Sequence, residues 1–118
     1  MKQFGLPPSS LLRTTKEFER VYQHGQRMKG NKFSLIYLAN DRHYNRLGIS
    51  IQKKTGTAVR RNRIKRLLRE TFRQHRELFP DVSDIVITIR PGFTPNSLTD
   101  IITAIRELRD TQGGKYPA

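Results

Sequence analysis

Residues 84–90 are Asp-Ile-Val-Ile-Thr-Ile-Arg, a nearly continuous run of β-branched side chains that Pro91 and Gly92 bring to an end. A strand with one solvated face alternates apolar and polar residues, whereas a strand covered on both faces is apolar almost throughout. This stretch therefore predicts a strand that is buried on both sides, and the rest of the fold has to supply its cover.

Two further strands are predicted upstream of this one. Residues 32–40 place partly apolar sets on both faces: Phe33, Leu35 and Tyr37 on one, and Ser34, Ile36 and Leu38 on the other. This pattern favours a central position in a sheet. Residues 47–51 alternate cleanly, and the polar turn at residues 41–45 favours an antiparallel hairpin with residues 32–40. Residues 26–31 form a candidate short strand before this pair.

Two helical segments are predicted around these strands. Thr14 and Glu17 have the spacing of a capping box, in which each residue satisfies a free backbone N–H of the other. A short helix should follow and end at Gly25. Its apolar face would carry Phe18, Val21 and Tyr22. The longest helical pattern covers residues 58–78 and stops before Pro80.

A last helix is predicted after the β-branched run. Ser97 and Asp100 suggest a second capping box, and the apolar stripe that follows consists of Leu98, Ile101, Ile102, Ile105 and Leu108. The predicted order is helix, two or three strands, helix, strand, helix. We therefore expect a single-domain α+β sandwich over residues 1–118, with an ordered core at about 10–111 between a loose lead-in and a frayed tail containing Gly113, Gly114 and Pro117.

The charge is strongly positive and unevenly distributed. The chain has 23 Lys and Arg against 10 Asp and Glu, a net charge of +13. Residues 1–76 contain 19 of the basic residues, while residues 77–118 carry a slight excess of acids. Such an asymmetry indicates a polyanionic partner for the first part of the chain. Without cysteine, disulfides and thiolate zinc sites are excluded. No apolar run approaches the length of a membrane span or a secretory signal, so we expect a cytoplasmic location.

The basic residues concentrate in residues 53–76, Lys-Lys-Thr-Gly-Thr-Ala-Val-Arg-Arg-Asn-Arg-Ile-Lys-Arg-Leu-Leu-Arg-Glu-Thr-Phe-Arg-Gln-His-Arg. On a helical wheel one face is apolar, with Ile64, Leu67, Leu68, Thr71 and Phe72. The opposite face carries Asn62, Arg66, Arg69 and Arg73. Cations in the first helical turn oppose the helix dipole at a cost of about 0.3–1 kcal/mol each. An ordinary solvated face would not need Arg60, Arg61 and Arg63 there, whereas bound phosphate would compensate them.

The pattern Lys53-Lys54-x-Gly56-x-Ala58-Val59-x-Arg61-Asn62-Arg63-x-Lys65-Arg66-x-x-Arg69 resembles the Arg-Asn-Arg signature of the protein subunit of bacterial ribonuclease P. Shorter matches are Phe18-x-x-Val21-Tyr22-x-x-Gly25, Gly48-Ile49-Ser50 and the strand that ends at Arg90, so the resemblance spans about residues 10–110. The proline-bearing N-terminus and Gln52, where a small residue is usual, depart from the family pattern.

The resemblance implies a subunit of the Mg²⁺-dependent ribonucleoprotein that removes the 5′ leader of precursor tRNA. It implies that the catalytic groups and the Mg²⁺ belong to the RNA, and that the helix crosses over between parallel strands with left-handed topology, against the usual preference. Contacts to the catalytic RNA carry over to Arg61, Asn62, Arg63, Lys65, Arg66 and Arg69, and the helical wheel adds Arg73. A leader-binding cleft carries over to Phe18, Tyr22, Ile36, Lys53, Lys54 and Arg90.

The residues themselves give little support to catalysis by this chain. His24, His43 and His75 are scattered, and the acids do not cluster near a candidate base or in a metal-binding pattern. We therefore expect no catalytic residue, metal ligand, bound cofactor or protein partner here. The expected partners are the catalytic RNA and precursor tRNA. Two alternatives remain at this point: a non-enzymatic RNA-binding module, and a basic amphipathic helix that binds a membrane surface.

Overall fold

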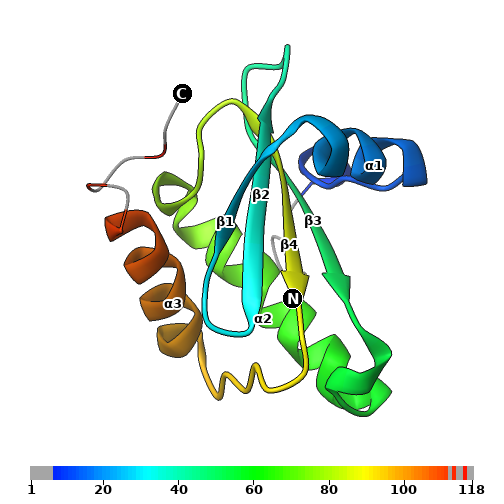
Figure 1. The fold of residues 1–118 in the computed structure, drawn as a ribbon, viewed down its shortest axis with the longest axis vertical. Coiled ribbons are helices and arrows are strands. Elements are labelled where there is room, and N and C mark those ends of the chain that lie inside the picture. Colours follow the sequence, from blue (N-terminus) through cyan, green and yellow to red (C-terminus); the bar gives the residue numbers. More distant parts are fainter. Residues whose placement is uncertain (1–6, 112, 114–115, 117–118) are drawn as a thin grey trace, which may run out of the picture.

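Strand β4 (Ser83–Ile89) lies inside a four-stranded mixed sheet in the computed structural model, which describes residues 7–111, 113 and 116 (Figure 1). The sheet order is β1-β2-β4-β3, with β1 (Gln26–Lys29), β2 (Phe33–Ala39) and β3 (Arg46–Ile51). The prediction that β4 is buried on both faces is confirmed, since Ser83 to Ile87 are all buried. The short strand expected near residue 26 is also present. Part of the predicted lead-in, as well as Gly114 and Pro117, lies outside the described residues.

The predicted hairpin between β2 and β3 is wrong. Strand β4 lies between them, pairing antiparallel with β2 and parallel with β3. The hairpin was inferred from the short turn between the two strands, but a short turn does not oblige its strands to pair. Because β4 is apolar on both faces, it gains more from the central position than the cleanly alternating β3 does.

Three helices cover the two faces of the sheet unequally. Helix α2 (Ala58–Gln74) and helix α3 (Leu98–Asp110) lie together on one face, while α1 (Thr15–His24) lies on the other (Figure 1). Strands β3 and β4 run downward in Figure 1, with β4 to the left of β3 and α2 passing behind the sheet between them. The crossover is therefore left-handed, as the resemblance implied.

The long helix is shorter than its sequence pattern predicted. It ends at Gln74, His75 leaves the helical conformation, and a 3₁₀ turn follows at Arg76–Leu78. The turn directs Leu78 and Phe79 into the core, where the Phe79 ring meets the Phe72 ring edge-on at 5.1 Å between centroids. Burying two further large side chains accounts for the early end of the helix. Two other 3₁₀ turns lie at Pro8–Ser10 and Lys53–Thr55.

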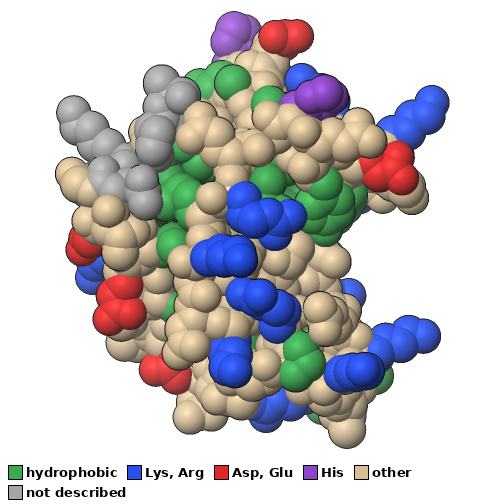
Figure 2. Space-filling model, viewed as in Figure 1, with side chains coloured by type: hydrophobic (Ala, Val, Ile, Leu, Met, Phe, Trp, Pro, Cys, Tyr) green, Lys and Arg blue, Asp and Glu red, His purple; other side chains and the backbone are tan. Residues whose placement is uncertain are grey.

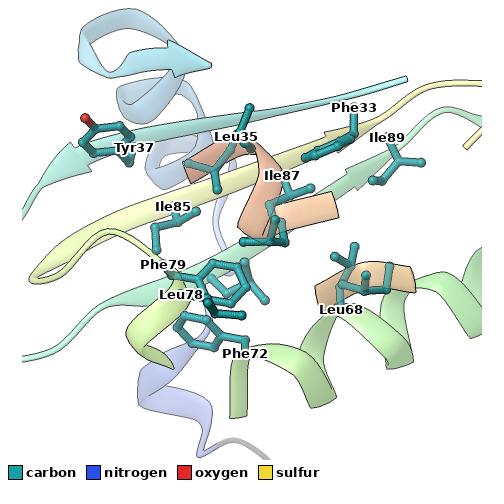
Figure 3. Packing of buried hydrophobic residues seen from close by; sticks show 14 of the residues in the cluster. Phe33, Leu35, Tyr37, Leu68, Phe72, Leu78, Phe79, Ile85, Ile87 and Ile89 are labelled. Atoms are coloured by element: carbon teal, nitrogen blue, oxygen red, sulfur yellow. The ribbon is translucent and has the colours of Figure 1, made fainter. Parts of the chain in front are cut away.

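The sheet separates two apolar cores. The larger lies between the sheet and helices α2 and α3, and Figure 3 shows strand side chains such as Leu35, Ile85 and Ile87 meeting Leu68 and Phe72. This confirms the predicted apolar face of α2, with Ile64, Leu68, Thr71 and Phe72 buried. The smaller core lies under α1 and consists of Leu12, Val21, Ile36 and Val86, with Phe18 and Leu38 against them. Because this core is small, much of that face of the sheet stays uncovered.

The predicted caps are present with one difference. Thr14 Oγ1 accepts from the Glu17 N–H and Glu17 Oε1 accepts from the Thr14 N–H, which is a complete capping box. At α3, Ser97 accepts from the Asp100 N–H, but the Asp100 carboxylate accepts from Asn96, one residue before the cap. Only the hydroxyl half of the second box therefore forms.

A buried ion-pair network joins α1 to the two parallel strands, and the sequence patterns did not reveal it. Arg46 on β3 binds Asp84 on β4 through two hydrogen bonds, Nε–Oδ1 at 2.8 Å and Nη2–Oδ2 at 2.7 Å. Its remaining terminal nitrogen, Nη1, donates to Glu17 Oε2 on α1 at 3.1 Å. Asp84 is 1% exposed and also accepts from Asn40. The network fixes α1 on the sheet with directional bonds in addition to apolar packing.

These contacts favour the ionised carboxylates. The backbone N–H groups of Arg13 and Thr14, followed by the Arg46 guanidinium, lower the pKa of Glu17 from 4.5 to about 2, although burial opposes them. Burial acts to raise the pKa of Asp84, but its hydrogen bonds to Arg46 and Asn40 outweigh that effect and lower it. A carboxylate whose pKa is depressed by folding stabilises the protein above its ordinary pKa and loses this contribution as the pH falls.

We therefore predict that Glu17→Gln lowers the free energy of unfolding at pH 7 by about 1 kcal/mol. The variant should also lose less stability than the wild type between pH 4.5 and about 2, the interval over which Glu17 titrates differently in the two states. Urea denaturation at several pH values measures both effects, with Glu19→Gln on the exposed side of α1 as the control. Parallel pH profiles for wild type and Glu17→Gln would contradict the assignment.

Candidate RNA interface

The uncovered part of the sheet, on the same side as α1, carries a row of cations. Residues paired across adjacent strands share a face, and Arg27 pairs with Ile36 while Lys29 pairs with Ser34, both of which point to the α1 side. Arg90 follows β4 on this side, and its N–H donates to the carbonyl of Lys32. Figure 2 shows Lys and Arg side chains running down this face. We call this surface the open face; its basic residues are Arg27, Lys29, Lys32 and Arg90.

The aromatic residues predicted for the cleft border the open face. Tyr22 is 38% exposed, whereas Phe18, one helical turn earlier, is half-buried. Phe18 lies directly over Gly48 of β3, where an added Cβ would come within 2.6 Å of its ring. Glycine at this position therefore allows α1 to approach the sheet closely. Tyr22 offers an accessible ring, and Phe18 offers one edge of a ring.

Lys53 and Lys54 approach the open face from the turn that follows β3. Both are exposed. Since β3 and β4 are parallel, this turn and Arg90 emerge at the same edge of the sheet. Figure 2 shows the molecule hollowed on the right, over β3 and between α1 and this turn. The structure therefore places Phe18 and Tyr22 on α1 beside the open face, and Lys53, Lys54 and Arg90 at the end of the sheet where β3 and β4 finish.

Ile36 is the exception. It is 1% exposed and packs with Val21 and Val86 beneath α1, so it offers the cleft no accessible surface. Conversely, sequence reasoning missed Arg27, Lys29 and Lys32. Their positions depend on the pairing of β1 with β2, and the short, polar β1 gave no strong strand signal.

The outer face of α2 forms a second basic surface. Asn62, Arg66 and Arg69 are exposed, and Lys65 is half-buried. Together with Leu11, Glu70 and Arg73 they line a groove of about 520 Å³. Arg73 differs from the others because Glu70 binds it through two hydrogen bonds; this pair raises the pKa of Arg73 and lowers that of Glu70. Part of its charge is therefore neutralised within the chain.

The positive charges in the first turn of α2 have more partners within the chain than the sequence suggests. Arg61 turns back and donates to the carbonyls of Lys53 and Gly56 at 3.4 and 3.2 Å. Arg63 donates to the carbonyl of Asn96 in the loop before α3. Carbonyl oxygens thus satisfy two of the cations that oppose the helix dipole, while Arg60 remains exposed. The cations that oppose the helix dipole are therefore weaker evidence for bound phosphate than the sequence implied. The exposed side chains of Asn62, Arg66 and Arg69 are stronger evidence for it.

The burial of α2 bears on the membrane alternative. Its apolar face packs in the larger core, so that face is not available to a bilayer. None of the helices in the described part of the chain is long and apolar enough to cross a membrane. Only the polar sides of this helix are therefore available to a partner.

The carboxylates that form close ion pairs with arginine stabilise the fold. Glu17 and Asp84 bind Arg46, and Glu70 binds Arg73. Within residues 7–111, 113 and 116, no group of three or more His, Asp or Glu is arranged to hold a metal ion. His24 and His43 are exposed, and His75 lies 3.5 Å from Glu77.

Comparison with known proteins identifies the family. The family model described as Ribonuclease P matches residues 6–112. The chain belongs to the ribonuclease P protein family. It is 45% identical over 114 residues to the ribonuclease P protein component of Desulfotalea psychrophila, covering 97% of this chain and 95% of that protein. It is 38% identical to that of Syntrophus aciditrophicus, covering 86% and 85%.

Solved ribonuclease P proteins share the fold. The chain is similar to the protein from Staphylococcus aureus with a TM-score of 0.78 and 27% identity, covering 91% of this chain and 98% of that one. It is similar to the protein from Thermotoga maritima with a TM-score of 0.70 and 27% identity, covering 91% and 97%. Membership makes this chain the protein subunit of the ribonucleoprotein that matures the 5′ end of tRNA, which displaces the non-enzymatic alternative.

Proposed function

We propose that this ribonuclease P protein uses two separate RNA surfaces, one for each RNA partner. The outer face of α2, with Asn62, Lys65, Arg66 and Arg69, binds the catalytic RNA. The open face of the sheet, bordered by Tyr22 and by Lys53 and Lys54, binds the 5′ leader of precursor tRNA. The observation that carries the proposal is the position of these two sets: the first lies on α2, whereas the second lies on α1, on the turn after β3 and on the opposite face of the sheet. They adjoin only beside β3, where Arg69 lines a groove with Phe18, Gly48 and Ile49.

The chemistry of each surface fits its partner. Arginine donates two parallel hydrogen bonds to phosphate, so a helix with Arg66 and Arg69 one turn apart suits the backbone of a folded RNA. A single strand is bound by aromatic rings that stack on bases and by cations along its backbone. Tyr22 supplies an accessible ring, and the basic residues of the open face supply the cations.

Hydrolysis in this proposal belongs to the RNA partner and its Mg²⁺, which would activate water and stabilise the leaving oxygen. The carboxylates of Glu17, Asp84 and Glu70 hydrogen-bond to arginine side chains. Because their oxygens are engaged in these bonds, they do not fit a metal site. This chain then contributes affinity for the substrate and orientation of its leader. No residue of the protein takes part in bond cleavage.

The function is tested by reconstitution. We predict that the purified chain stimulates 5′ cleavage of precursor tRNA by bacterial ribonuclease P RNA at a low Mg²⁺ concentration at which the RNA alone is slow. Arg106→Ala, which removes an exposed cation from α3 on the opposite face of the sheet, should stimulate as well as the wild type. Absence of stimulation by the wild type would refute the proposed function.

Division of labour is tested with one variant on each surface. Arg66→Ala should weaken binding to the catalytic RNA and reduce the slope of log affinity against log salt by about one unit. Tyr22→Ala should leave that affinity unchanged and cost about 1–3 kcal/mol of leader binding, the value of one stacked base. Filter binding with precursor and mature tRNA measures the second effect. Equal losses on both partners from both variants would contradict two separate surfaces.

A further inference from the structure

Two arginines of the basic helix bind the protein itself, and the backbone they bind lies next to the open face. Arg61 reaches the carbonyls of Lys53 and Gly56, in the turn that carries Lys53 and Lys54. Arg63 reaches the carbonyl of Asn96, at the end of the loop that begins after Arg90. Both loops leave the same edge of the sheet, because they follow the parallel strands β3 and β4.

The turn bound by Arg61 has few bonds of its own. Within it, the Thr55 N–H donates to the Gln52 carbonyl at 3.0 Å, and the Gly56 N–H donates to the Lys53 carbonyl at 3.4 Å, which is long. The Thr55 hydroxyl oxygen is buried without a hydrogen-bond partner. Arg61 Nη1 donates to both carbonyls, so one terminal nitrogen of the guanidinium adds two hydrogen bonds to a turn whose own bonding is sparse.

The loop bound by Arg63 is held at its two ends. At its start, the Phe93 N–H donates to the Arg90 carbonyl, and the Phe93 ring lies 5.3 Å from the Phe33 ring. At its end, Asn96 donates its N–H to Asp100 and accepts from Arg63. Arg63 thus links the end of the Arg90 loop to α2 across the edge of the sheet.

We infer that Arg61 and Arg63 are positioning residues for the leader-binding face, which tie to α2 the two loops that carry its cations. Arg61 fixes the turn with Lys53 and Lys54, and Arg63 fixes the loop after Arg90. The inference rests on the proposed function, since it assigns these loops to leader binding. It separates the Arg-Asn-Arg signature into two roles: Asn62, on the outer face between them, contacts the catalytic RNA, whereas the flanking arginines act through the loops they hold.

The test replaces each arginine with lysine, which keeps the charge but loses the guanidinium and shortens the side chain. Arg66→Lys is the matched control, because Arg66 lies on the same helix and is exposed. We expect Arg61→Lys and Arg63→Lys to lower the preference for precursor over mature tRNA by roughly two- to tenfold, the factor for about one net hydrogen bond. Arg66→Lys should leave that preference unchanged. For the catalytic RNA, the loss of affinity in Arg61→Lys or Arg63→Lys should not exceed the loss in Arg66→Lys.

A double-mutant cycle distinguishes positioning from direct contact. Arg61→Lys should have little further effect on leader preference once Lys53 and Lys54 are both replaced by alanine, but should keep its full effect in Arg90→Ala. Arg63→Lys should show the reverse dependence. Additive effects in every background, or a preference unchanged by both lysine variants, would overturn the inference while the wild-type preference for leader still stood. A wild type without any leader preference would instead refute the proposed function.

Discussion

The rest of the structure depends on the double pairing of β4, which hydrogen-bonds to β2 on one edge and to β3 on the other and is buried on both faces. Its apolar side chains contribute to both cores. Asp84, at its start, forms the buried pair with Arg46 that also reaches Glu17 on α1. One strand therefore fixes the register of the sheet, the path of the crossover through α2 and the position of α1 on the sheet. Removing one partner from such a buried pair generally costs more than forming the pair contributes.

The two proposed RNA surfaces follow from this arrangement. Because β3 and β4 are parallel, the loops that follow them emerge at one edge and bring Lys53, Lys54 and Arg90 together. Because α1 covers only the smaller core, the neighbouring part of the sheet stays open. Helix α2 buries its apolar face on the opposite side of the sheet and leaves its arginines outside. The cations thus divide between two surfaces that are joined through the first turn of α2.

Much of this could be predicted from local patterns. The apolar run of β4, the capping box of α1 and the helical wheel of α2 correctly identified buried faces, since each depends on residues close in sequence. The strand order could not be deduced in the same way, because the choice between pairing β3 with β2 or with β4 depends on burial across the whole sheet. The Arg46–Asp84 pair and the cations of β1 were missed for that reason. Ile36 was assigned to the cleft through the resemblance, although the apolar pattern of its own strand agrees with its burial. The carbonyl contacts of Arg61 and Arg63 depend on loop geometry that no periodicity describes.

The central claim, that two surfaces bind two different RNA partners, is tested most directly by site-specific crosslinking. The chain contains no cysteine, so a single introduced thiol gives one defined attachment point. A photo-crosslinker on Ser50→Cys, on the open face, and one on Val59→Cys, exposed in the first turn of α2, would be compared in the assembled complex with precursor tRNA. The account predicts crosslinks from position 50 to the 5′ leader and from position 59 to the catalytic RNA. Crosslinks from both positions to the same RNA would contradict it.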